Sequence, residues 1–264
     1  MNKNLCFAKK VKTKIIIVII SAASFFVFSP NLFAQSHITP KTAADAIKTA
    51  QNNGQYLFLL FYETKEDSVK VMENTVKDFK SKTSEKISFH RARTTDYNEK
   101  DIIAKYGIDR APLPVLLVFA PNGAMTGGFV QKVTEKELKG SIVSDLVMSI
   151  SKTVQEKKIA LVLLQNNRTK FNKESLIAAQ EFSNDSKLKG FVDIIKADPD
   201  DSKNNSFISS LKLNEKISEA IVVFIVPPGT IAGVFKGNIS KDTLMSALSS
   251  CSSGSDNKGC CPRR

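Results

Sequence analysis

The residues with the widest chemical repertoire in this sequence are three cysteines near its C-terminus. Cys251, Cys260 and Cys261 lie in 249–264, a Ser- and Gly-rich stretch without apolar periodicity, which predicts a flexible tail. Their thiols fit three arrangements: a structural disulfide from Cys251 to Cys260 or Cys261, a redox arm that exchanges disulfides with a partner, or a soft-metal site for copper or zinc. Vicinal Cys260 and Cys261 do not close easily on each other, so Cys251 is the favoured disulfide partner.

A second metal-binding hypothesis concerns His37. If a leader is cleaved after Ala34, the new N-terminus begins Gln35-Ser36-His37 and offers an amine, two amides and an imidazole, a set that can wrap Cu(II) or Ni(II). The alternative is that His37 is an ordinary residue of a flexible end. Because the two histidines and the terminal cysteines have no zinc-site spacing, we expect no cofactor beyond copper or zinc on the tail.

Carboxylates gather at a predicted strand-to-helix turn, where Glu63, Glu66 and Asp67 follow an apolar run. One interpretation is a polar recognition surface or an acid/base pair in a groove. The other is that acids favour helix N-termini, where backbone amides are unsatisfied and the dipole is positive. With no histidine, metal ligand or nucleophile nearby in the sequence, we favour the second interpretation over catalysis.

Apolar periodicity predicts the elements that position these residues. For example, 56–62 is a continuous apolar run, too short for a helix and suited to a strand buried on both faces. A parallel strand pair joined by a helix, then a hairpin and a covering helix, predicts an α/β fold with a mixed sheet and helices on both faces. The predicted order for the first half is helix 42–53, strand 56–62, helix 67–80, strand 87–92, helix 100–106, strands 115–120 and 125–130, and helix 135–150.

The second half repeats this order, because its turn at 227–229 lies 106 residues after the turn at 121–123. Such a long period indicates two copies of a whole domain. The predicted elements are strand 159–164, helix 175–182, strand 191–197, helix 206–213, strands 220–226 and 231–235, and helix 241–248. The predicted domains are a leader at 1–34, a first domain at 40–150, a linker at 151–157, a second domain at 158–248 and the tail at 249–264.

The leader has a lysine-rich head and an apolar run at 15–28, which is short for a membrane span of about 20 residues. Cleavage after Ala34 would place the protein in the periplasm or outside the cell, whereas a retained leader would be a membrane anchor. Removing the five leader lysines lowers the net charge from +12 to +7. Since the other lysines are scattered among acids, we expect no nucleic-acid partner.

Two stretches of the first half resemble the thioredoxin-like family. Residues 61–70, FYETKEDSVK, lie where that family has its first central strand followed by Trp-Cys-Gly-Pro-Cys-Lys, and 106–115, YGIDRAPLPV, resembles the stretch that carries its cis-proline. Counting back from the strand at 115 places Pro114 at the cis-proline position, and counting forward from Tyr106 places Pro112 there. We favour Pro114, because the register of a buried strand is more tightly fixed than a loop length.

The sequence departs from the family at the redox site, because Glu66 and Val69 occupy the positions of the two cysteines. Neither side chain exchanges disulfides, so we expect the domain to be redox-inactive there. In the family, an extended peptide is received between this turn and the cis-proline loop. The resemblance therefore implies a binding surface at 111–114 together with Glu63, Glu66, Asp67, Ser68 and Val69.

The second half matches the family more weakly. Residues 165–170 replace the active-site turn, and Glu219-Ala220 stands where a cis-proline would be. This half resembles the redox-inactive thioredoxin-like domains that supply substrate-binding surface in disulfide isomerases.

The sequence thus predicts two tandem thioredoxin-like domains in an exported binding or scaffold protein of envelope redox or metal homeostasis. Its expected partner is a protein or a peptide segment, and we expect a binding protein rather than an enzyme. The alternative is a thiol-disulfide oxidoreductase or soft-metal handling protein that acts through Cys251, Cys260 and Cys261.

Overall fold

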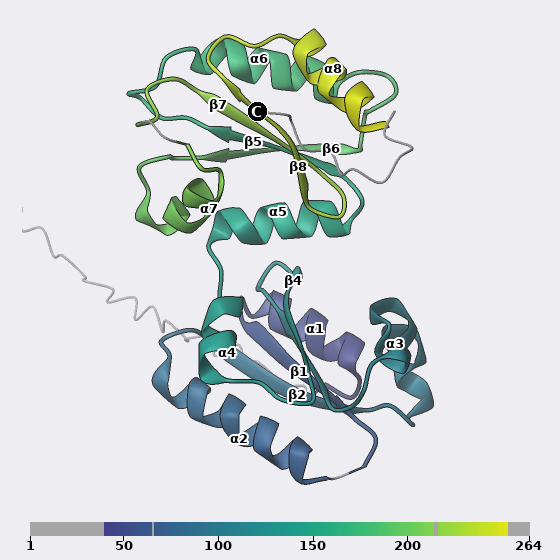
Figure 1. Cartoon of the computed structure of the whole chain (residues 1–264). Coiled ribbons are helices and arrows are strands. Elements are labelled where there is room, and N and C mark those ends of the chain that lie inside the picture. Colours follow the sequence, from purple (N-terminus) through teal and green to yellow (C-terminus); the bar gives the residue numbers. More distant parts are fainter. Residues whose placement is uncertain (1–39, 65, 214–215, 253–264) are drawn as a thin grey trace, which may run out of the picture. The chain divides into compact units, whose positions relative to one another are not determined.

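A computed structural model describes residues 40–252 except 65 and 214–215, and for 251 and 252 it describes the helix but not the side chains. This part of the chain forms two four-stranded sheets with flanking helices, in the strand orders β2-β1-β3-β4 and β6-β5-β7-β8 (Figure 1). The chain has the expected mixed α/β fold of two tandem thioredoxin-like domains. Among the described residues, none of the helices combines the length and the apolar character that a membrane span requires.

The first domain follows the predicted element order closely. β1 pairs in parallel with β2 and antiparallel with β3, and β3 forms a hairpin with β4. Its elements are α1 (Ala43–Asn52), β1 (Tyr56–Tyr62), α2 (Asp67–Lys82), β2 (Ile87–Arg93), η1 (Tyr97–Glu99), α3 (Lys100–Tyr106), η2 (Ile108–Arg110), β3 (Val115–Phe119), β4 (Met125–Val130) and α4 (Glu135–Ser141).

The central strand β1 explains why the apolar run at 56–62 is continuous. Successive strand side chains point to opposite faces. Phe58 and Leu60 belong to the core beneath α2 and α4, whereas Leu59 and Phe61 belong to the core beneath α1. A strand covered on both faces must be apolar at every position, as expected from the sequence.

The second domain has the same strand pairing. Both hairpins also have a register irregularity at equivalent places, after Val118 and after Phe224. Its elements are α5 (Asp145–Gln155), β5 (Ile159–Leu164), α6 (Asn172–Ser183), β6 (Val192–Ala197), η3 (Ser202–Asn204), α7 (Asn205–Ser210), β7 (Ile221–Val226), β8 (Thr230–Lys236) and α8 (Lys241–Ser252).

The helix predicted over 135–150 is wrong, because two helices, α4 and α5, are separated by residues 142–144. The Ser144 side chain accepts a hydrogen bond from the Val147 N–H at 3.4 Å and caps α5, with Asp145 in its first turn. Ser-Asp is a helix-start signal, and Gly140 and the β-branched Ile142 and Val143 disfavour a continuous helix. α5 extends to Gln155, so most of the predicted linker at 151–157 is helical.

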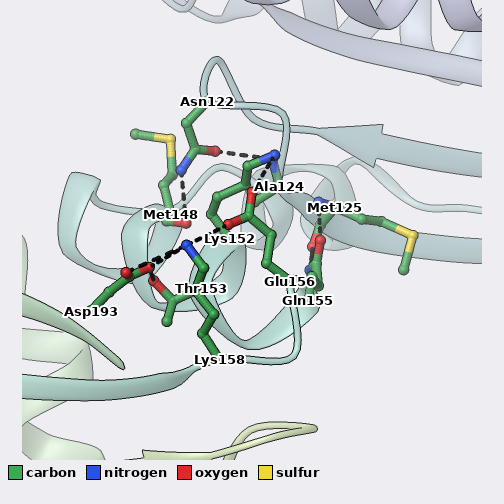
Figure 2. A network of polar contacts seen from close by, with 10 residues as sticks. All are labelled: Asn122, Ala124, Met125, Met148, Lys152, Thr153, Gln155, Glu156, Lys158 and Asp193. Atoms are coloured by element: carbon green, nitrogen blue, oxygen red, sulfur yellow. Dashed lines mark hydrogen bonds and ion pairs between the residues drawn. The ribbon is translucent and has the colours of Figure 1, made fainter. Parts of the chain in front are cut away.

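Helix α5 belongs to the second repeat, where it occupies the place of α1. Leu146 and Ile150 pack into the core of the second domain, while Met148 packs against the first. Figure 2 shows its polar contacts: the Gln155 amide accepts from the Met125 N–H at 2.9 Å and donates to the Met125 carbonyl at 2.7 Å, and Asn122 donates to the Met148 carbonyl at 2.8 Å. Helix α5 therefore packs side chains against the cores of both domains.

The last helix, α8, continues beyond the predicted end at residue 248 and reaches Ser252. The Ser249 and Ser250 hydroxyls donate to the carbonyls of Met245 and Ser246, four residues earlier, at 3.0 and 2.9 Å. These bonds use polar side chains within the helix, so the polarity of 249–252 does not end it. The first residues of the predicted flexible tail, including Cys251, are helical.

Candidate binding site in the first domain

The site predicted from the sequence begins at the carboxyl end of β1. Residues 63–66, called the acidic turn, connect β1 to the N-terminus of α2. Val69 is 4% exposed and belongs to the apolar stripe that fixes α2 on the sheet. Because β1 ends at Tyr62 and α2 begins at Asp67, Glu63 and Glu66 lie at the edge of the sheet, where both are exposed.

The second component is the cis-proline loop, residues 111–114, immediately before β3. Of the two cis peptide bonds in the described residues, one joins Leu113 to Pro114 and the other joins Pro227 to Pro228. Pro114, the residue favoured from strand register, is buried, whereas Pro112 is exposed. The Gln131 N–H donates to the Pro114 carbonyl at 2.7 Å, which ties the end of the loop to the chain beyond β4.

These two components meet in a small pocket of about 60 Å³. It brings Glu63, Glu66 and Val69 together with Pro114, as the resemblance implied, but Asp67 and Ser68 do not line it. The lining residues are Tyr62, Glu63, Thr64, Glu66, Val69, Leu113 and Pro114. Because these seven residues include neither cysteine nor histidine, they lack the thiol pair that the family uses for redox exchange.

The acidic side chains at this edge have local partners. The Thr64 hydroxyl donates to Glu66 at 2.8 Å, and Asp67 pairs with Lys70 at 3.2 Å. The Arg93 side chain donates to the Glu63 carbonyl at 3.1 Å. Asp67 lies in the first turn of α2, where a negative charge is favourable. These local partners agree with the preference of acidic residues for helix N-termini, which is the interpretation favoured from the sequence.

The backbone of Leu113 is the most informative feature of the pocket. Neither its N–H nor its carbonyl has a hydrogen-bond partner within the described part of the chain. Leu113 is half-buried beside the pocket, and a backbone amide in such a place is costly to leave unpaired. An added extended segment would satisfy both groups.

The equivalent edge of the second domain is closed by the chain itself. Lys170 lies in the turn after β5, and its N–H donates to the Ser218 carbonyl at 3.1 Å while its carbonyl accepts from the Ala220 N–H at 2.8 Å. Lys170 and Glu219 thereby form a parallel bridge. Glu219 occupies the position of Leu113, so its neighbours are already paired with the chain.

Side chains reinforce this closure. Asn166 donates to Asp198 at 2.8 Å and also to Asp200, and Arg168 forms an ion pair with Asp200. Hydrogen bonds from Arg168 and Asn166 hold the pKa of Asp200 below its usual range. The turn at 165–170 is therefore fastened to the loop after β6 as well as to the segment before β7.

Two groups of predicted residues lie outside this site. His37, Cys260 and Cys261 fall outside the described residues, as does the side chain of Cys251. Among the residues that the structure does describe, no group of three or more His, Cys, Asp or Glu is placed to hold a metal ion.

Sequence analysis missed one buried charge, Glu99, which is 2% exposed. Both its carboxylate oxygens accept from the Ala43 N–H, at 3.0 and 3.1 Å, at the start of α1. Burial raises the pKa of Glu99, with smaller contributions from Asp96 and Asp45, while the bond from Ala43 opposes the rise. The apolar period of α3 gives no signal for it, because Glu99 precedes that helix.

Comparison with known proteins supplies no family name. No protein-family model matches the sequence, and no functionally curated protein matches it. The solved structures to which it is similar include the zinc-bound form of human ERp44, at 17% identity and a TM-score of 0.34, covering 78% of this chain and 55% of that one. The chain thus spans about half the length of ERp44.

Two shorter structures are spanned almost completely. The first two thioredoxin domains of Saccharomyces cerevisiae Eps1p share 14% identity at a TM-score of 0.28, over 79% of this chain and 96% of that one. The NTD_N/C domain of the alkylhydroperoxide reductase AhpF from Enterococcus faecalis shares 16% identity at a TM-score of 0.27, over 76% and 97%. At such low identity these likenesses concern the fold alone, and the strand order and pairing of this chain carry the assignment of thioredoxin-like domains.

Proposed function

We propose that this chain is an exported binding protein that receives an extended segment of a partner protein between the acidic turn and the cis-proline loop. The observation that carries the proposal is the unpaired backbone of Leu113 beside the pocket. The closed edge of the second domain supports it, because there Lys170 of the chain itself pairs with Ser218 and Ala220, the residues on either side of Glu219, which is the equivalent of Leu113. Its setting would be envelope redox or metal homeostasis, and it would not exchange thiols at this site.

Peptide selection on the full chain tests this function. Random decapeptides displayed on phage are expected to yield binders that shift the backbone amide NMR signals of 63–66 and 111–114. They should leave those of 165–170 and 218–220 unchanged. Binders that map to the second domain, or a failure to select any, would contradict the proposal.

A backbone variant makes the test sharper. Leu113→Pro removes one N–H donor, and one hydrogen bond corresponds to about two- to ten-fold in affinity. Lys77→Gln, at an exposed position of α2 that does not line the pocket, is the control and should leave the affinity unchanged. Equal affinity for Leu113→Pro and the parent chain would argue against backbone pairing, while the NMR map of the parent chain tests the site without any substitution.

Insulin reduction by the full chain separates binding from the redox alternative. We expect no thiol-disulfide exchange activity. Activity that is lost in Cys260→Ser would instead support an oxidoreductase working through the terminal cysteines.

A further inference from the structure

The two domains differ in how well their last helix covers the helix after the first strand. In the second domain α6 and α8 have 12 residues each, whereas in the first domain α2 has 16 and α4 only 7. Leu138 of α4 and Leu244 of α8 occupy equivalent positions, and both are completely buried. α4 ends at Ser141, soon after this shared anchor, while α8 continues to Ser252.

An open cleft of about 530 Å³ lies between α4 and the C-terminal end of α2. The half-buried Ile142 supplies most of its apolar surface, and Phe79, which is 7% exposed, lies at its base; both also pack on the core of the first domain. Phe79 stacks on Phe58 with ring centroids 6.0 Å apart, which fixes its ring at the base of α2. In the second domain Met245 packs against the core, but the equivalent residue of α4 is Lys139, which lines the cleft.

The charges around the cleft are unbalanced. Lys82 and Glu135 neutralise each other in an ion pair of 2.6 Å that joins α2 to α4. Lys136 and Lys139 have no ion-pair partner in the described residues, and Glu85 is the remaining carboxylate of the lining. The cleft therefore presents apolar surface with two available ammonium groups at its rim.

The ends of this chain do not complement such a surface. Residues 1–39 contain lysines and no acid, and 253–264 contain one acid, Asp256, against Lys258, Arg263 and Arg264. Like charges at the rim would oppose their binding. The rim charge instead complements a ligand that combines apolar side chains with carboxylates, which neither of these segments does.

We infer that this cleft is a docking site for an acidic amphipathic helix of a partner protein. Its apolar face would cover Phe79 and Ile142, in the way that the longer α8 covers its own domain. Flanking carboxylates would pair with Lys136 and Lys139. Helices present apolar side chains three and four residues apart, so one face can fill the cleft while adjacent positions carry the charge. This interaction does not depend on the proposed peptide site.

Two synthetic helical peptides of 15 residues test the inference. Both carry leucines on one face and a single tryptophan, and they differ only in having glutamate or lysine beside the leucines. Because the protein has no Trp, the tryptophan emission of the peptide reports binding to the full chain. The glutamate peptide is expected to bind about three- to ten-fold more tightly than the lysine peptide, the range for two exposed ion pairs.

The double variant Lys136→Gln with Lys139→Gln should remove this preference. The matched control neutralises two exposed lysines elsewhere, Lys77→Gln with Lys189→Gln, and should keep it. Backbone NMR shifts caused by the glutamate peptide should concentrate at 79–85 and 135–142. Equal binding of the two peptides, shifts confined to other regions, or a dimer of the chain that already covers these residues would each overturn the inference.

Discussion

The second domain joins the turn after β5 to the segment before β7 with its own backbone, whereas the first domain leaves a pocket between the acidic turn and the cis-proline loop. The difference has a simple chemical origin. Ala220 uses its N–H to bind Lys170, but the equivalent residue, Pro114, has no N–H to donate. The two copies of the fold thus differ at this edge in one backbone donor, and the contacts of Asn166 and Arg168 add to the closure of the second domain.

The largest expected effect compares the two anchors of the last helices. Leu138→Ala and Leu244→Ala each empty a fully buried position, and each should lower the free energy of unfolding by about 2–5 kcal/mol. Hydrogen exchange followed by mass spectrometry should show faster exchange in the domain that carries the change. Val71→Ala, at a position 60% exposed, is the control and should change stability by less than about 0.5 kcal/mol. Equal acceleration in both domains would show that they unfold as one unit.

A smaller effect is expected from giving the second domain the proline of the first. Ala220→Pro removes the N–H that binds the Lys170 carbonyl at 2.8 Å, and because Lys170 is exposed it should cost about 0.5–1.5 kcal/mol, the net contribution of one hydrogen bond. Amide exchange at 165–170 should accelerate while exchange at 63–66 stays the same. An unchanged rate at 165–170 would mean that Asn166 and Arg168 hold the turn without the backbone bond.

The smallest effect concerns pH and the buried charge of the first domain. Because the pKa of Glu99 is raised above its ordinary value of 4.5, the folded state binds this proton more tightly than the unfolded state. Stability from this group is therefore greatest below that value and is lost as pH rises through the raised pKa. The second domain has the uncharged Asn204 at the equivalent position.

Urea unfolding of the parent chain and of Glu99→Gln, from below pH 4.5 to neutral pH, measures what Glu99 contributes to the free energy of unfolding. Glutamine keeps one oxygen to accept from Ala43, so the variant should gain stability relative to the parent at neutral pH. The advantage should shrink as pH falls below the raised pKa. A difference that stays constant with pH would assign the pH dependence to other groups.

The parts of the fold that could be predicted from sequence are those governed by continuous apolar patterns. The buried strands β1, β3, β5 and β7 are apolar because both faces are covered, so their existence could be predicted, whereas the pairing of β1 with β3 and of β5 with β7 could not. The break between α4 and α5 was missed because apolar residues continue across 142–144, and only the cap at Ser144 marks it. Periodicity detects a helical face but does not show which of two cores that face enters.

The candidate site likewise has features that could be predicted from the sequence and features that could not. The acidic turn and Pro114 were identified because the resemblance placed both at the same edge. The unpaired backbone of Leu113 was not predictable, since it depends on what neighbouring segments do rather than on the leucine itself. Likewise the closure of the second domain depends on a contact between residues about 50 positions apart, Lys170 and Glu219, whose side chains give no indication of it.

Tyr56 is a natural spectroscopic probe beside the short connection between α4 and α5, because its hydroxyl bonds the backbone of that connection. It donates to the Val143 carbonyl at 3.0 Å and accepts from the Val143 N–H at 3.1 Å. The protein has four tyrosines and no tryptophan, so phenol emission and absorbance are not masked by indole. Burial raises the pKa of Tyr56. The bond with Val143 opposes this rise, so late phenolate formation in an alkaline titration reports, without any added dye, whether the Tyr56 hydroxyl is still buried.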